Sequence, residues 1–368
     1  MKYVKYKLGD IVTFLNGRAF FMPELQDNGK YRILRVGNLS GGNDSWYYSD
    51  MELDDNKYCE KGDLLYAWAC NFGPHIWKEG KVIFHYHIWK LIENKDKVDK
   101  TYLYYYLLHQ TPFYLGGVNG ATMVHITKKS MEEKTVFIPS SLKVQHRIAS
   151  ILSTYDTLIE NNTKRIRILE KMAENLYKEW FVRFRFPGHE NVKMVNGLPN
   201  GWKKGALSDV CEFKRGKNIT SSEMKDGTIP VISAGITPSG FHSHANVYGI
   251  SVTMSSSGAN AGYIAVHYSD IWAADCSYIE EASTPCIYYV YELLNNIRSI
   301  INNFQRGAAQ PHVYPKDINR IKMIIPSEDI RKKANEKIGV IHRHIDNLQR
   351  QNSLLARQRD LLLPRLMS

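Results

Sequence analysis

Two stretches of the chain carry apolar residues at alternating steps of four and three positions. The first stripe consists of Ile148, Leu152, Tyr155, Ile159, Asn162, Ile166, Leu169, Ala173, Leu176 and Trp180. The second stripe lies 186 residues later and consists of Ala334, Ile338, Ile341, Ile345, Leu348, Asn352, Leu355, Arg359, Leu362 and Leu366. This spacing is a heptad seam, and it predicts two helices of roughly 33 residues, each about 50 Å long.

A helix of this length cannot be buried inside one small domain, so we expect the two seams to pair with each other. An antiparallel pairing would place Asn162, at a d position, opposite Asn352, at an a position, and the two amides would fix the register. A parallel pairing would oppose Asn162 to Leu348 and Asn352 to Ile166, which buries two amides without partners. We therefore predict an antiparallel coiled coil with pseudo-twofold symmetry.

The rest of the chain is repeated as well. The motifs Gly120-Ala121-Thr122-Met123-Val124-His125-Ile126 and Ile138-Pro139-Ser140 return 187 residues later as Gly307-Ala308-Ala309-Gln310-Pro311-His312-Val313 and Ile325-Pro326-Ser327. Nearer the N-terminus, Gly17-Arg18 corresponds to Gly216-Lys217 at an offset of 199, and Ile33 corresponds to Val231 at an offset of 198. The offset changes stepwise because loops tolerate insertions and deletions. The pattern predicts one unit present in two copies.

Together these patterns predict an α+β protein with two similar mixed α/β domains, each followed by a long helix. The predicted parts are a first domain at residues 1–141, a first spacer helix at 142–186, a second domain at 187–327 and a second spacer helix at 328–368. A chain of 368 residues is long enough for two cores. It has no apolar run of about 18 residues and no apolar N-terminal signal, so we expect a cytoplasmic protein that does not enter a membrane.

Composition suggests a polyanionic partner and gives little support for catalysis. The formal net charge is +11 and the isoelectric point is about 9.2, which favours nucleic acid as the partner. The five cysteines form no Cys-x-x-Cys pair, and His85-Tyr86-His87 and His242-Ser243-His244 lack further ligands, so we expect neither a disulfide framework nor a metal site. Asp209, Glu212 and Lys214 look like part of a nuclease site. The first copy has Asp10, Thr13 and Leu15 there, which argues against catalysis.

The motifs follow one another in a fixed order: a domain, a Gly-Ala segment, Ile-Pro and a helix beginning near Val144-Gln145-His146-Arg147. The same series returns after Leu198-Pro199-Asn200-Gly201-Trp202. This order resembles that of the specificity (S) subunit of type I restriction-modification systems. The resemblance covers essentially the whole chain. It implies a non-catalytic subunit whose two target-recognition domains each recognise one half of a bipartite sequence in double-stranded DNA, with the paired helices setting the gap.

The resemblance also implies two methyltransferase (M) subunits and restriction (R) subunits as protein partners. S-adenosylmethionine, ATP and Mg would then belong to those subunits, and this chain would bind no cofactor. The sequence agrees, since it contains neither an amino-methyltransferase motif nor a phosphate-binding loop.

Base recognition requires side chains with paired donors and acceptors, on loops that can approach DNA closely. The candidate DNA-binding residues are Arg18, Asn71, Phe72, Asn119 and Thr122 in the first copy, and Lys217, Asn218, Ser257, Asn260 and Gln310 in the second. We expect the repeated His125 and His312 to be structural. Because the candidate loops differ between the copies, the target should be asymmetric. Binding should weaken with salt, with a slope of log K against log salt concentration of about −0.9 per neutralised phosphate.

Two other functions fit the same patterns. The chain could be the recognition subunit of a related restriction system in which methylation and cleavage belong to one fused partner. It could also be a coiled-coil adaptor that assembles proteins without binding DNA, in which case it would not retard duplex DNA in a sequence-dependent way.

Overall fold

The computed structural model describes residues 2–39, 45–116, 126–307 and 311–367. Contacts divide the chain into two compact units, unit 1 with residues 1–160 and 352–368, and unit 2 with residues 161–351. This division cuts through both spacer helices, because each helix contributes one half to each unit. Within the described ranges, no helix combines the length and apolarity needed to cross a membrane.

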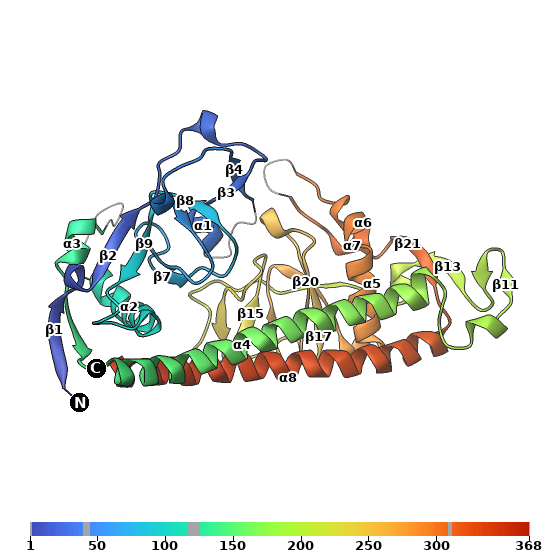
Figure 1. Cartoon of the computed structure of the whole chain (residues 1–368). Helices are drawn as coiled ribbons and strands as arrows, with labels where there is room; N and C mark the ends of the chain where they lie inside the picture. Colours follow the sequence, from blue (N-terminus) through green and yellow to red (C-terminus); the bar gives the residue numbers. More distant parts are fainter. Residues whose placement is uncertain (1, 40–44, 117–125, 308–310, 368) are drawn as a thin grey trace. The chain divides into compact units, whose positions relative to one another are not determined.

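Among its described residues, unit 1 contains three small sheets and, besides parts of the two spacer helices, three shorter α-helices (Figure 1). Its first sheet pairs β1 (Tyr3–Lys7) with β10 (Thr135–Pro139). The second has the order β2 (Val12–Asn16), β9 (Ile88–Glu93), β6 (Leu64–Ala67), β7 (Gly73–Ile76). The third has the order β4 (Tyr47–Ser49), β3 (Tyr31–Leu34), β8 (Val82–Phe84), β5 (Tyr58–Cys59). The helices are α1 (Val36–Leu39), α2 (Lys100–Leu115) and α3 (Lys128–Glu132).

Unit 2 repeats this arrangement. Its β13 (Lys203–Ala206) pairs with β21 (Lys322–Ile325). A four-stranded sheet has the order β14 (Lys214–Arg215), β20 (Cys276–Glu280), β17 (Ser251–Ser255), β18 (Ile264–His267). A three-stranded sheet has the order β16 (Gly240–His242), β15 (Ile229–Ile232), β19 (Trp272–Ala273). A hairpin of β11 (Met194–Val195) and β12 (Leu198–Pro199) and the helices α5 (Ile287–Asn296), α6 (Arg298–Asn302) and α7 (Pro315–Ile318) complete it.

The strand registers confirm that the two units contain copies of one domain. In unit 1, β3 and β8 are parallel, with Ile33 opposite Ile83. In unit 2, β15 and β19 are also parallel, with Val231 opposite Trp272. Parallel pairing requires a long connection, so its occurrence at equivalent residues is a specific feature of the fold. The predicted correspondence of Ile33 with Val231 therefore matches the strand pairing.

The repeated Ile-Pro motif marks the point where each domain passes into its spacer helix. β10 ends at Pro139 and β21 ends at Ile325, and the side chains of Ile138 and Ile325 are both buried. A proline has no backbone N–H to extend a strand ladder, so the strand stops at the motif. The helices begin shortly afterwards, α4 (Leu142–Tyr177, 36 residues) in the first copy and α8 (Glu328–Met367, 40 residues) in the second.

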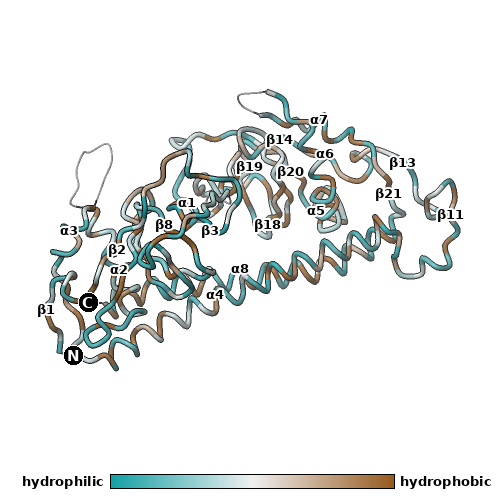
Figure 2. Tube along the Cα trace, turned by 45° about the horizontal axis from the view of Figure 1, so that its top comes forward, coloured by the Kyte–Doolittle hydropathy of each residue, from teal (hydrophilic) through white to brown (hydrophobic). Residues whose placement is uncertain are grey.

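Every predicted seam position of α4 and α8 is buried or half-buried. Figure 2 shows hydrophobic and hydrophilic residues alternating along both helices, as expected for one covered stripe and one solvated face. The first helix ends before residue 186. A π-turn at Lys178–Val182 follows α4, and Phe184 has a φ of 58°. This kink places Phe181 and Phe186 against Trp202 in the core of unit 2.

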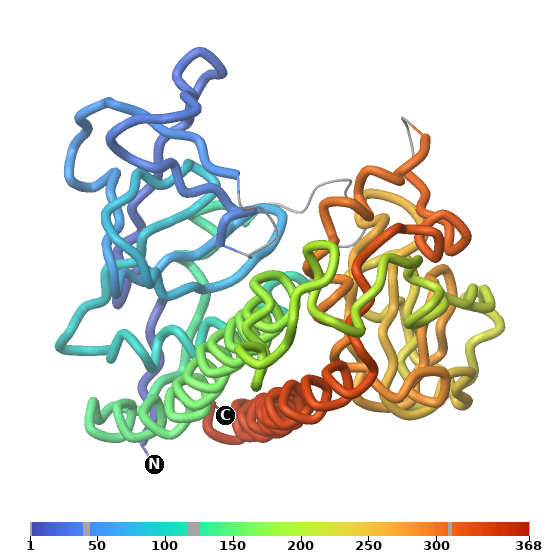
Figure 3. The backbone as a smooth tube through the Cα atoms, turned by 90° about the vertical axis from the view of Figure 1, so that its right-hand side faces the viewer, coloured from blue at the N-terminus to red at the C-terminus, as the bar shows by residue number. Residues whose placement is uncertain are grey.

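The two helices pair in an antiparallel direction within each unit, as predicted. In unit 1 the core contains the beginning of α4 and the end of α8, through Ile148, Ala149, Leu152, Leu363 and Met367. In unit 2 the core contains the end of α4 and the beginning of α8, through Ala173, Tyr177, Ala334 and Ile338. Figure 3 shows the beginning of α8, in orange-red, beside the yellow and orange strands of unit 2. Each domain core is therefore continuous with the helix pair.

A glycine at the end of the first strand of each four-stranded sheet is required by close backbone packing. A Cβ on Gly17 would lie 2.4 Å from the carbonyl oxygens of Phe84 and His85. A Cβ on Gly216 would lie 2.4 Å from the carbonyl oxygen of Ala274. The next residue then continues the same contact, because Arg18 N–H donates to Phe84 O at 3.0 Å and Lys217 N–H donates to Ala273 O at 2.9 Å. The glycine therefore allows the two sheets of each domain to approach this closely, and the hydrogen bond of the next residue joins them.

We predict that Gly17→Ala destabilises the protein by about 2 kcal/mol, because the added methyl group overpacks a site lined by backbone atoms that cannot rotate away. Urea unfolding of the full chain measures the effect. Gly80→Ala is the matched control, since a Cβ there meets nothing within 4 Å. Equal unfolding midpoints for the two variants would show that the sheets are not in the close contact described.

Candidate nucleic-acid interface

The predicted DNA-binding loops occupy equivalent positions in the two copies. The first loop connects β6 to β7, which are antiparallel with Ala67 opposite Gly73. The second connects β17 to β18, with Met254 opposite Ile264. Each loop begins at the strand, β6 or β17, that pairs with the equivalent strand β9 or β20 in the four-stranded sheet of its domain. The spacing of glycines and amides in the sequence thus located the same structural loop twice.

In unit 2 the structure brings two of the predicted segments together. Gly258 N–H donates to Pro311 O at 3.0 Å, and Val313 N–H donates to Ser256 O at 3.0 Å. The segment that follows Gln310 is therefore hydrogen-bonded to the loop between β17 and β18. Gln310 itself, like Asn119 and Thr122, lies outside the described residues.

The predicted side chains in these loops differ in how they can act. Asn71 is exposed, whereas Phe72 is half-buried and packs against the core of unit 1. Asn260 is half-buried in a short turn. Ser257 is only 6% exposed, and its hydroxyl donates to Asp275 Oδ2 at 2.5 Å. Ser257 therefore offers little surface to a ligand and braces the loop instead.

Cys70 gives the first loop an unusual backbone. It has a φ of 61°, a left-handed conformation that residues other than glycine rarely adopt and that is concentrated at functional loops. Its side chain is exposed, whereas the other four cysteines are buried; all five are free thiols. Burial raises the pKa of Cys211 and Cys276 to about 12 and also raises the pKa of Cys59 and Cys286. The buried thiols should therefore remain protonated and unreactive.

The basic residues that follow the repeated glycines have different surroundings. The Arg18 guanidinium forms two hydrogen bonds to Glu24, at 3.2 and 2.7 Å, and lies over the ring of Phe20. Lys217 and Asn218 are exposed, and Trp272 Nε1–H donates to the carbonyl of Lys217 at 2.9 Å. The backbone of Lys217 is thus held in place while its side chain is exposed to solvent, whereas the Arg18 side chain is bound to its neighbour Glu24.

That neighbour belongs to a turn that sequence reasoning missed. Glu24 accepts a hydrogen bond from Phe21 N–H at 2.9 Å, and Glu223 accepts one from Thr220 N–H at 2.7 Å. The two pairs are separated by the offset of 199 that aligns Gly17 with Gly216. The hydrogen bond from Arg18 lowers the pKa of Glu24, with a second contribution from Phe21 N–H, so the brace is present at neutral pH.

The same turn exposes different chemistry in each copy. In unit 1 it presents Phe21 and Met22, which are 74% and 76% exposed. In unit 2 it presents Thr220, Ser221 and Ser222, all exposed. Two adjacent apolar side chains held out into solvent on a braced turn are suited to insertion between base steps or contact with a thymine methyl group, whereas hydroxyls are suited to phosphate and base edges.

A second difference between the copies lies in the segment that connects the two sheets of each domain, between β8 and β9 in unit 1 and between β19 and β20 in unit 2. Unit 1 carries His85-Tyr86-His87 there, packed against Trp68, whose Nε1–H donates to Tyr86 O at 2.8 Å. Burial lowers the pKa of His85 to about 4, and the charges of His87 and Arg35 act in the same direction, so its imidazole is neutral at pH 7. A neutral imidazole has one donor and one acceptor to offer.

Unit 2 has a shorter return with an acidic residue. His85 N–H donates to Leu34 O and Ala274 N–H to Ile232 O, which aligns the two returns. Asp275 follows Ala274 and pairs with Arg215 at 2.5 Å. An aromatic and imidazole surface in one copy thus corresponds to an ion pair in the other.

Two other histidines of unit 2, His312 and His242, have partners within the fold. His312 is half-buried, forms an isolated bridge with Ser257 and stacks on Tyr314; the structural role expected for it stays a prediction, and His125 lies outside the described residues. His242 Nδ1 accepts from Lys225 N–H at 2.9 Å. Among the residues that the structure describes, no group of three or more His, Cys, Asp or Glu is placed to hold a metal ion.

A model of the type I restriction modification DNA specificity domain matches residues 1–171 and 199–357 of the chain. The chain belongs to this family. In this specificity-domain protein, each matched segment covers one copy of the repeat and most of the spacer helix after it. The family that the motif order suggested is therefore confirmed.

Individual relatives of this specificity-domain protein span most of its length. The type I restriction enzyme MjaIX specificity subunit of Methanocaldococcus jannaschii is 28% identical over 303 residues, which cover 74% of this chain and 69% of that protein. The putative type I specificity subunit S.MgeORF438P of Mycoplasma genitalium is 25% identical over 275 residues, or 73% of this chain and 71% of that protein. The crystal structure of a type I restriction-modification system S subunit from M. genitalium matches 100% of this chain and 96% of its own, with 18% identity and a TM-score of 0.64, so the fold is shared.

We predict that a maleimide labels one thiol of the native protein near neutral pH. Cys70 is exposed and should react, whereas the four buried thiols should react only after unfolding. Mass spectrometry of the labelled protein measures the number and the position. Cys70→Ser is the control and should take up no label; rapid labelling of Cys211 or Cys276 would contradict the described cores.

Proposed function

We propose that this chain is the sequence-specific DNA-recognition subunit of a type I restriction-modification complex. One observation carries the proposal. The turn braced by Glu24 and by Glu223 has the same backbone support in both copies but exposes Phe21-Met22 in one and Thr220-Ser221-Ser222 in the other. A shared scaffold with divergent exposed residues is expected of two readers of different sequences, since base contacts specify while the scaffold positions them.

The recognised target is proposed to be bipartite and asymmetric. Apolar side chains and imidazoles in unit 1 favour contacts with base faces and methyl groups, and Lys217, Asn218 and the hydroxyls of unit 2 favour polar edges and phosphates. A net charge of +11 supports binding to a polyanion. The chain itself is proposed to be non-catalytic, and its membership of the specificity-domain family supports this.

The proposed partners are double-stranded DNA, two methyltransferase subunits and restriction subunits. S-adenosylmethionine, ATP and Mg are proposed to act on those subunits. The relatives are named as specificity subunits of type I restriction enzymes, which supports an assembly of this kind. The spacer helices are proposed to set the gap between the half-targets, with the two domains related by a pseudo-twofold axis.

The register of the spacer helices is proposed to depend on Asn162 and Asn352. Asn162 is 8% exposed at a seam position of α4, and Asn352 is half-buried at a seam position of α8. A polar amide in an apolar seam costs stability but penalises alternative registers. The contact between the two amides stays a prediction.

We expect mapping of methylated bases in the source genome to reveal one interrupted motif with two different halves separated by a fixed gap. The physical reason is that two domains with different exposed residues are carried by the same pair of spacer helices. Loss of that methylation after deletion of this gene, and its return with the intact gene, would tie the motif to this chain. Unchanged methylation after deletion, or a palindromic motif, would contradict the proposal. Methylation that also requires a neighbouring fused methyltransferase-nuclease gene would instead indicate the related restriction system.

We predict that Phe21→Ser together with Met22→Ser weakens binding of the native target about tenfold, because the apolar contacts with bases are lost. The slope of log Kd against log salt should stay the same, since no cation is removed. Lys217→Ala is the matched contrast, and it should lower the slope by about 0.9 if Lys217 neutralises one phosphate. Fluorescence anisotropy with the methyltransferase complex measures both. Native affinity in the double variant would exclude this turn from the interface.

A further inference from the structure

One helix in each domain, α2 or α5, lies directly on a spacer helix at equivalent residues. Tyr102 and Tyr289, both fully buried, are related by the offset of 187 found for the domains. The same offset relates Tyr105 of α2 to Glu292 of α5. On the spacer helices, the offset of 186 relates Asp156 of α4 to His342 of α8.

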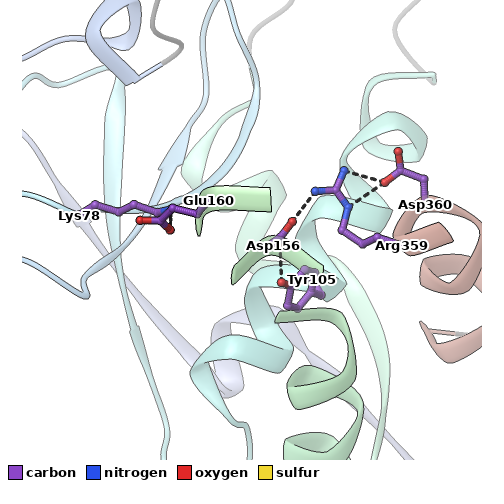
Figure 4. A network of polar contacts seen from close by, with 6 residues as sticks. All are labelled: Lys78, Tyr105, Asp156, Glu160, Arg359 and Asp360. Atoms are coloured by element: carbon purple, nitrogen blue, oxygen red, sulfur yellow. Dashed lines mark hydrogen bonds and ion pairs between the residues drawn. The ribbon is translucent and has the colours of Figure 1, made fainter. Parts of the chain in front are cut away.

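In unit 1, Tyr105 and Asp156 form a contact between the domain and the helix pair (Figure 4). The Tyr105 hydroxyl donates to Asp156 Oδ2 at 2.5 Å. Asp156 Oδ1 accepts from Arg359 Nη1 at 2.5 Å, and Arg359 also binds Asp360. Arg359 is one of the two polar members of the second seam, and this contact explains its presence. Asp156 thus joins α2, α4 and α8.

In unit 2, Glu292 and His342 form the equivalent contact with different chemistry. His342 Nε2 lies 3.1 Å from Glu292 Oε1, and the side chains are 2% and 5% exposed. His342 Nδ1 lies 2.8 Å from the Tyr268 hydroxyl, and the Tyr288 ring stacks on the imidazole at 5.1 Å. A histidine with its proton on Nε2 donates to Glu292 and accepts from Tyr268, so both ring nitrogens are satisfied.

We infer that Tyr105–Asp156 and Glu292–His342 are equivalent positioning contacts that fix the orientation of each recognition domain on its spacer helix. They thereby restrict the number of base pairs allowed between the two half-targets. This inference rests on the proposed function and adds a determinant of spacing that is separate from the residues that contact bases. In the part of the chain that the structure describes, the hydrogen bonds of the two pairs go to Arg359 and Tyr268 and not to the candidate loops.

Apolar and polar contacts differ in how strictly they fix the orientation of a domain on a helix. The seam residues around these pairs, such as Leu152 and Ile338, are fully buried, and apolar surfaces tolerate small rotations at little cost. A buried hydrogen bond is directional, and a domain that pivots away from it leaves a polar group without a partner. The polar pair therefore selects one orientation among those that the apolar surface permits.

Unit 1 also offers a contact that should not have this property. Lys78 of the domain pairs with Glu160 of α4 at 2.6 Å, with side chains 65% and 39% exposed. Exposed ion pairs contribute little, because water replaces either partner. Lys78→Ala is therefore a matched control at the same boundary between domain and helix.

The experiment uses the full chain in its complex with the methyltransferase partner. DNA duplexes carry the two half-targets at the native gap and at gaps one base pair shorter or longer, and methylation is measured at each. Tyr105→Phe removes one oxygen and leaves the Asp156–Arg359 pair, so the protein should still fold. We expect Tyr105→Phe and Glu292→Leu each to raise the ratio of off-gap to native-gap methylation about fivefold, the factor expected for one net hydrogen bond.

Conservative replacements separate positioning from general stability. Glu292→Gln keeps an oxygen that accepts from His342 and should retain the wild-type ratio. Lys78→Ala should retain it as well.

The outcomes distinguish this inference from the proposed function. A wild-type complex that methylates no bipartite target would overturn the proposed function. A wild type that methylates only the native gap, with Tyr105→Phe and Glu292→Leu equally strict, would overturn the positioning role alone. A uniform loss of methylation at every gap would also overturn it, because that is the effect of stability without positioning.

Discussion

The continuity between each domain core and the helix pair is the constraint on which the structure depends. In unit 1, Leu152 and Met367 from the two helices share a core with Tyr102 and Leu103 of α2. In unit 2, Ala173 and Ile338 share a core with Tyr289 and Leu293 of α5. A long amphipathic helix derives most of its stability from packing of its apolar face, and here that face is covered partly by the other helix and partly by a domain. Neither part can shift without opening the other.

This constraint explains which features followed from the sequence. The heptad seams are local patterns, and they predicted both helices, their antiparallel direction within each unit and the complete or partial burial of every seam position, including the half-buried Arg359. The parallel pairing of Ile33 with Ile83 is not local. It depends on a chain return through β5, β6 and β7, and no periodicity of the strands encodes it.

The candidate interface shows the same division. Glycine and amide spacing located the loops before β7 and β18, because glycine permits a tight connection whatever the surrounding fold. The turn at Phe21 was missed, although Glu24 and Glu223 lie at the offset already established. The two turns share the glutamate that binds the backbone, whereas their exposed residues differ. A search for exposed residues that occur in both copies therefore does not find this turn. Ser257 is the opposite case. It was predicted to bind DNA because its residue type suits base contact, but its hydroxyl donates to Asp275 inside the fold.

The positioning pairs were invisible in the sequence for a related reason. Tyr105 and Glu292 are different residue types, and so are Asp156 and His342. The two contacts are therefore recognised as equivalent only when both members of each pair are compared in the structure. Changing Tyr105 alone to glutamate would oppose two carboxylates, which repel in a poorly solvated site. Changing Asp156 alone to histidine would keep an imidazole acceptor for the tyrosine hydroxyl but would remove the carboxylate that binds Arg359. The contact between domain and helix can therefore pass through a tyrosine–histidine pair, but only together with a change at Arg359, so the residue types of each copy are coupled across α2, α4 and α8.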